Sequence, residues 1–130
     1  MRTKALIGKK IHIKVNISEN ANQNNPIAFD LLFVYDKGLL KKILTMSARE
    51  WFKRKPQITK DNILGKDMDY WSWEWVPGQK VPILSLPLKP KAKGGVIFVN
   101  YFSPVEHRIK IDPFKDLVVD LREREVVVRY

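Results

Sequence analysis

Residues 94–102, with the sequence GGVIFVNYF, restrict the fold more than any other stretch of the chain. The run is rich in β-branched and aromatic residues and starts with a Gly pair, a pattern typical of a buried strand. One face would carry Val96, Phe98 and Phe102, and the other Ile97, Val99 and Tyr101. Since both faces are apolar, a layer must cover this strand on each side. Asn100 interrupts the run, and we expect it to be a hydrogen-bonded polar group inside the sheet.

Other segments follow the alternation of half-buried strands. Residues 9–17 place Ile11, Ile13 and Val15 on one face and polar side chains on the other. The same criteria predict further strands at 28–36, 68–76, 81–88, 107–111, 117–122 and 125–130. Pro82 and Pro87 would confine their strand to a sheet edge. We therefore expect an all-β fold, a two-sheet β-sandwich of about eight strands, in a single domain over residues 1–130.

A short helical insertion is expected within this sandwich, at about residues 47–55. Ser47 and Glu50 match a capping box, in which each side chain bonds the backbone amide of the other residue. The helix would end before Pro56, because proline disfavours helical backbone in the preceding residue. Trp51 and Phe52 would dock on the sheet. This helix is the expected cover for the second face of the central strand.

Trp71, Trp73 and Trp75 recur at every second position and share one face of the expected strand 68–76. Such a row could stack sugars or unpaired bases, which would make the chain a nucleic-acid or glycan binding module. It could also fill the space between two sheets as part of the core. We favour the core, because an exposed row of this kind would form a large apolar patch.

The net charge of +10 is unevenly distributed. Residues 37–60 contain eight Lys and Arg, against Glu50 as the single acid. Such a basic surface attracts an acidic protein, nucleic acid or anionic lipid through a salt-sensitive field, and it also keeps a protein in solution. No segment reaches the roughly 18 apolar residues of a membrane span, and the apolar run within residues 1–8 is too short for a secretory signal.

The residues that usually carry catalysis are sparse. The chain has no Cys, which excludes a thiolate nucleophile and a cysteine zinc site. It also lacks the phosphate-loop, H-E-x-x-H and G-x-S-x-G motifs. His12 is expected on the wet face of its strand, and His107 is far from it in sequence. We expect no catalytic, cofactor-binding or metal-binding residues and no enzyme activity.

The stretch Ser18-Glu19-Asn20-Ala21-Asn22-Gln23-Asn24-Asn25, called the asparagine loop below, contains no apolar residue larger than Ala. Asn tolerates left-handed backbone and bonds within its own turn, so we expect a polar surface loop between the first two strands. Loops of this length in compact domains are usually functional or mobile. These eight residues are the candidate contact surface for a partner.

The order of these features resembles the TssJ (SciN-like) family, the small outer-membrane lipoproteins of bacterial type VI secretion systems. The resemblance extends over nearly the whole chain and rests on the succession of features rather than on one motif. It is carried by Val15-Asn16, the asparagine loop, Pro26, Val34-Tyr35, the segment from Ser47 to Phe52, Pro77-Gly78, the strand from Gly95 to Tyr101 and the final hairpin from Val118 to Val128.

This resemblance implies a transthyretin-like β-sandwich in the periplasm, anchored to the outer membrane through an N-terminal lipidated cysteine. We expect the signal and that cysteine to have been removed, since the chain contains no Cys. The resemblance further implies a non-catalytic scaffold component that binds the periplasmic domain of the inner-membrane protein TssM through the asparagine loop, with no cofactor and no nucleic acid. The alternative is a nucleic-acid or glycan binding module that uses the Trp row and the basic surface.

Overall fold

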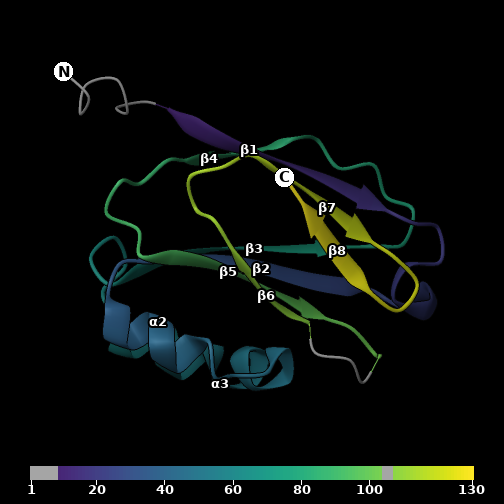
Figure 1. Cartoon of the computed structure of the whole chain (residues 1–130). Helices are drawn as coiled ribbons and strands as arrows, with labels where there is room; N and C mark the ends of the chain where they lie inside the picture. Colours follow the sequence, from purple (N-terminus) through teal and green to yellow (C-terminus); the bar gives the residue numbers. More distant parts are fainter. Residues whose placement is uncertain (1–8, 104–106) are drawn as a thin grey trace.

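A computed structural model describes residues 9–103 and 107–130, which form two facing four-stranded sheets with a helical layer on one of them (Figure 1). The strand order is β4-β1-β7-β8 in the first sheet and β3-β2-β5-β6 in the second. The expected all-β sandwich is confirmed, while the expectation for residues 1–8 lies outside the described residues. In chain order the elements are β1 (Lys10–Ile17), the 3-10 turn η1 (Ala21–Asn24), β2 (Ile27–Val34), α2 (Lys37–Ile43), α3 (Ala48–Asp61), β3 (Met68–Trp75), β4 (Leu84–Pro87), β5 (Gly94–Asn100), β6 (Arg108–Ile111), β7 (Leu117–Leu121) and β8 (Val126–Arg129).

The central strand β5 is covered on both faces, as the sequence predicts. Its Ile97 and Val99 pack in the core between the two sheets. Val96 and Phe98 point the other way, into a second core under the helices. All four side chains are fully buried. Two apolar layers on one sheet explain why this strand lacks the polar alternation of β1.

The helical layer is longer than expected, and the predicted end before Pro56 is wrong. The capping box of Ser47 and Glu50 is present, but α3 continues through Pro56 to Asp61. Pro56 lies on the solvent side of the helix, and contacts on each side of it hold the helix in place. Lys55 before it is tied to a buried carboxylate, and Ile58 after it is buried. Tertiary packing here outweighs the local cost of a proline.

A second helix, α2, follows β2 in a segment too short for its sequence to distinguish strand from helix. Asp36 caps it, since its Oδ2 accepts from the Leu39 amide at 2.8 Å. Leu40 and Ile43 are buried at helical spacing on the face turned to the sheet. No helix in the described part of the chain is both long and apolar enough to cross a membrane.

The end of β5 differs from the expectation at two residues. Asn100 is exposed rather than enclosed in the sheet, and Phe102 is 69% exposed instead of sharing the buried face of Phe98. The strand ends at Asn100, because the Phe102 amide donates to the Asn22 side chain at 2.7 Å and leaves the ladder. A contact from a distant loop therefore redirects the chain.

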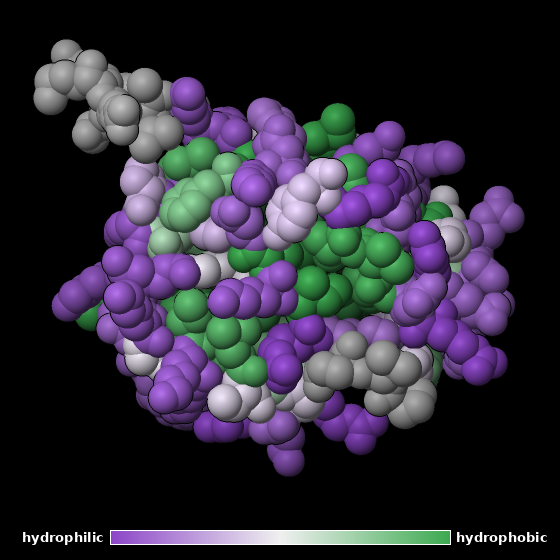
Figure 2. Space-filling view, in the orientation of Figure 1, coloured by the Kyte–Doolittle hydropathy of each residue, from purple (hydrophilic) through white to green (hydrophobic). Residues whose placement is uncertain are grey.

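The sheet edges agree with the sequence more closely. The proline-containing strand is an edge strand, although it is shortened to β4, Leu84–Pro87. Figure 2 shows hydrophilic side chains over most of one face and an apolar area at its centre, over the edge where β6 and β8 lie. Ile109, Val126 and Val128 of these strands are half-buried and pack against the core.

Candidate functional site

The asparagine loop forms a compact left-handed turn between β1 and β2. Asn22, Gln23 and Asn24 have positive φ angles of 51°, 53° and 65°. Asn adopts this region more readily than most residues, so the Asn-rich sequence suits the turn. Within the turn, the Asn25 side chain donates to the carbonyl oxygens of Asn22 and Gln23.

Asn22 holds the turn to the rest of the sandwich. Its side chain is 2% exposed, and its Nδ2 donates to Pro26 O at 2.9 Å while its Oδ1 accepts from the Phe102 amide. Its own amide donates to Arg122 O at 3.1 Å. Because these bonds reach the residue before β2, the segment after β5 and the β7–β8 turn, Asn22 fixes the loop and is unavailable to a partner.

The eight predicted contact residues therefore divide by exposure. Glu19, Asn20, Gln23 and Asn24 are exposed, Ser18 and Asn25 are half-buried, and Ala21 and Asn22 are buried. We call the exposed four the rim surface. It adjoins the β7–β8 turn, since the Asn20 side chain donates to Glu123 Oε2 at 3.1 Å and the Gln23 amide donates to Glu123 O. The structure thus provides an ordered polar surface at this end of the sandwich.

A hollow of about 270 Å³ lies beside the rim surface, between the asparagine loop and the start of α3. Arg49 and the exposed ring of Phe102 line it together with Asn25. Tyr101 closes its floor, where its hydroxyl donates to Arg122 O at 2.8 Å. Burial raises the pKa of Tyr101 above its ordinary value, so the phenol stays neutral. A cation and an exposed aromatic beside hydrogen-bonding amides suit contact with a protein surface.

Sequence reasoning missed Arg49 and Phe102. Nothing in the sequence around Arg49 places it beside the asparagine loop. Phe102 was assigned to the buried strand because it continues an apolar run. The one signal that could have placed it is the polar Asn100, which marks the end of the strand.

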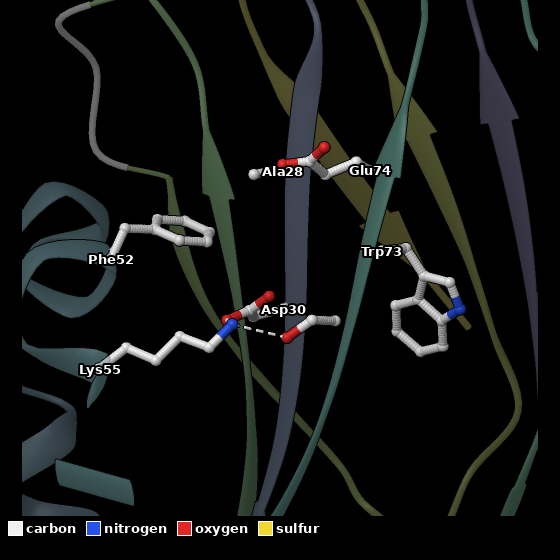
Figure 3. Close-up of a pocket in the computed structure, with 7 residues that line it drawn as sticks. Ala28, Asp30, Phe52, Lys55, Trp73 and Glu74 are labelled. Carbon is white, nitrogen blue, oxygen red and sulfur yellow. Dashed lines mark hydrogen bonds and ion pairs between the residues drawn. The ribbon is translucent and has the colours of Figure 1, made fainter. Parts of the chain in front are cut away.

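A second candidate site lies under α3, where a buried carboxylate meets a lysine (Figure 3). Asp30 is 1% exposed, and its Oδ2 accepts from Trp51 Nε1 at 2.8 Å and lies 2.9 Å from Lys55 Nζ. Lys55 also donates to Ser72 Oγ at 2.7 Å. Asp30, Trp51, Lys55 and Ser72 are thus bonded to one another, as expected for an anchor of the helix rather than a reactive centre.

The Trp row belongs to the core, as the sequence analysis favoured. Trp75 is buried, and Trp71 and Trp73 are half-buried with their rings against the core. Trp71 meets Phe33 edge-on at 5.2 Å between ring centroids, and Trp75 lies 5.1 Å from Phe29. The row therefore offers no open stacking platform to bases or sugars.

The histidines do not form a site with each other. His12 is exposed on β1, with Nδ1 3.5 Å from Asp116 Oδ1. His107 is buried, with its ring 4.9 Å from that of Tyr101. Among residues 9–103 and 107–130, no group of His, Cys, Asp and Glu has the arrangement of a metal site.

No protein-family model matches the chain, and no curated protein matches it in sequence. Solved structures match its fold over almost the full length. A chain described as "Type VI membrane complex" is 13% identical with a TM-score of 0.71, and the match covers 94% of this chain and 98% of that chain. The T6SS lipoprotein TssJ1 from Pseudomonas aeruginosa is 15% identical with a TM-score of 0.69, covering 94% and 97%.

A third match is a chain in a structure described as "T6SS protein TssM C-terminal domain (869-1107) from EAEC". It is 14% identical with a TM-score of 0.66, and the match covers 94% of this chain and 98% of that chain. The TM-scores of the three matches establish a shared fold. The resemblance to TssJ proteins that the sequence indicated is therefore confirmed at the level of the fold.

Proposed function

We propose that this chain is a TssJ-like lipoprotein component of a type VI secretion membrane complex, acting as a non-catalytic scaffold in the periplasm at the outer membrane. The observation that carries the proposal is the match of the whole sandwich, helical layer included, to a T6SS lipoprotein and to a type VI membrane complex chain. The order of sequence features led to the same family independently. The bonded state of the buried Asp30 group agrees with a structural role.

The proposed partner is the periplasmic domain of TssM, bound through the rim surface. In the structure described for TssM residues 869–1107, the match covers 94% of this 130-residue chain and 98% of the matched chain, so the two chains have similar lengths. That chain is thus much shorter than the span named for the TssM domain. A chain of this fold in a structure described for TssM supports a contact between the two proteins. The ordered rim surface and the hollow beside it supply the polar, aromatic and cationic groups for such a contact.

The test is binding of the purified TssM periplasmic domain from the same genome. The variant Glu19→Ala, Asn20→Ala, Gln23→Gly, Asn24→Gly, with Gly at the two positions of positive φ, should weaken binding at least about tenfold, which corresponds to about 1.4 kcal/mol. Asn22 stays intact because its burial makes it a stability residue. A control removes exposed side chains of α3 outside the rim surface, as Lys53→Ala and Arg54→Ala.

The outcomes distinguish two claims, that the chain binds TssM and that it does so through the rim surface. Weaker binding by the rim variant alone, with an unchanged melting temperature, supports both. If the α3 control loses binding and the rim variant keeps it, the interface lies on the helical layer and the rim assignment is wrong. If the folded wild-type chain shows no binding at micromolar concentrations, the proposed function is wrong.

A further inference from the structure

The end of the sandwich opposite the asparagine loop is built by segments that are far apart in sequence. There β1 begins, β2 ends and β3 and β5 begin (Figure 1). Since β1 has eight residues, the two ends are about 25 Å apart. Backbone bonds join these segments, from Leu88 N to Lys9 O, Lys93 N to Val34 O and Tyr35 N to Asp67 O. We call this surface, formed by Lys9 and residues 35–37, 60–67 and 88–93, the basic end.

Two adjacent aliphatic side chains project from the basic end. Ile63 and Leu64 are 58% and 52% exposed. Their turn is ordered, because Asp67 Oδ2 accepts from the Ile63 amide at 2.7 Å and the Asp67 amide donates to Ile63 O at 2.8 Å. Lys91 Nζ donates to Gly65 O in the same turn. The structure therefore holds an apolar pair in the solvent on a fixed loop, although burial would be favourable.

Lysines surround this apolar pair. The basic end contains seven Lys and no Arg, against three Asp. Six of the seven lysines are exposed, namely Lys9, Lys37, Lys60, Lys66, Lys91 and Lys93. None of these six forms an ion pair with a carboxylate among the described residues.

The acids of the basic end are already committed to local structure. Asp36 caps α2, Asp61 accepts from the Gln57 side chain, and Asp67 fixes the Ile63 turn. The positive field is therefore directed outward, around an apolar protrusion. Lysines that flank exposed aliphatic residues fit a lipid bilayer surface, where the charges meet anionic headgroups and the apolar pair enters the acyl boundary.

We propose that the basic end docks on an anionic membrane surface, with Ile63 and Leu64 inserted among the lipids and the surrounding lysines on the headgroup phosphates. The inference goes beyond the proposed function, since it needs no TssM and leaves the rim surface free at the far end. A bilayer is favoured over nucleic acid, because this end has no Arg and its exposed apolar residues are aliphatic.

The test is co-sedimentation of the chain with vesicles of phosphatidylcholine containing phosphatidylglycerol, and with phosphatidylcholine vesicles alone. The wild-type chain should bind the anionic vesicles, and added salt should weaken the binding. Lys37→Gln, Lys66→Gln and Lys93→Gln together should lower the partition coefficient about a hundredfold, at about fivefold for each lysine. A triple variant of equal charge, Lys14→Gln, Lys80→Gln and Lys110→Gln, removes exposed lysines elsewhere and should lower it far less.

The apolar pair needs its own comparison. Ile63→Ser with Leu64→Ser should lower binding at least about tenfold, whereas Val76→Ser with Ile83→Ser, at positions of similar exposure, should not. Failure to bind anionic vesicles, or equal losses in both lysine triples, would overturn the proposal. Binding to polyglutamate that needs the three lysines but not Ile63 and Leu64 would assign this end to an acidic protein instead. TssM is absent from these assays, so a negative result would overturn membrane docking without affecting the proposed binding of TssM.

Discussion

The indole of Trp51 lies nearly parallel to the ring of Phe98, with 9° between the planes and 5.3 Å between the ring centroids. Both side chains are fully buried. The indole Nε1 also donates to Asp30 Oδ2 at 2.8 Å. A single residue of α3 therefore covers the central strand and donates a hydrogen bond to a buried carboxylate.

Substitutions of Trp51 separate these two contributions. Trp51→Phe keeps a ring over Phe98 but removes the donor to Asp30, so it should lower the free energy of unfolding by about 2 kcal/mol. Trp51→Ala also leaves a cavity and should lower it by about 4 kcal/mol. Urea denaturation measures both values. Equal stability of Trp51→Phe and the wild type would show that the indole bond contributes nothing.

The Asp30–Lys55 pair should respond unequally to removal of its two partners. Lys55→Met leaves a carboxylate that is 2% exposed without its cation, at a cost of about 3 kcal/mol. Asp30→Asn still accepts from Trp51 and leaves a lysine that is 25% exposed and can turn to water, so it should cost about 1 kcal/mol. Chemical denaturation of both single variants and the double variant gives the coupling. A larger loss in Asp30→Asn would contradict this account.

The strands were predictable because each sheet face leaves its own period in the sequence. β1 alternates since one face is wet, and β5 does not alternate since α3 covers its second face. The helical layer was predictable only in part. A capping box marks the start of α3, but its passage through Pro56 depends on Asp30 and Ile58, which act through tertiary contacts.

The candidate surface was predictable at the level of its loop and not at the level of its residues. An Asn-rich stretch signals a left-handed turn, yet it does not say which Asn faces inward. Asn22 is inward because its partners, Phe102 and Arg122, come from the far end of the chain. Arg49 and Phe102 reach the same hollow through long-range pairing, which local sequence patterns do not encode.

Asn22 and Asn24 make a matched pair for testing the turn, because both have positive φ. Glycine adopts that backbone without strain, so replacement isolates the side chain. Asn22→Gly loses the bonds to Pro26 and Phe102 and should lower stability by about 3 kcal/mol. Asn24→Gly removes an exposed side chain and should change stability by less than about 0.5 kcal/mol. Thermal melts in parallel check the contrast, and similar losses at the two positions would contradict the assigned role of Asn22.

Asp120 gives the sandwich a defined response to acid. A hydrogen bond from the Asn16 side chain at 2.8 Å, together with Arg129 at 3.1 Å, holds the pKa of Asp120 below its ordinary value of 3.8. A carboxyl with a lowered pKa in the folded state contributes stability that is complete above the unfolded pKa. That contribution is lost as the pH falls through the folded pKa. The bond between Asn16 of β1 and Asp120 of β7 therefore stabilises the fold least in acid.

The measurement is the difference in unfolding free energy between the wild type and Asp120→Asn across pH. The difference should be constant above about pH 5 and shrink toward lower pH, as the wild type takes up a proton that the variant cannot. Added salt should change it little, because the largest cause is a bond from a neutral amide rather than an ion pair. Arg129→Met should flatten the pH dependence only in part, since Asn16 remains. A difference that grows on acidification would reverse the sign of the shift and contradict the role given to Asn16.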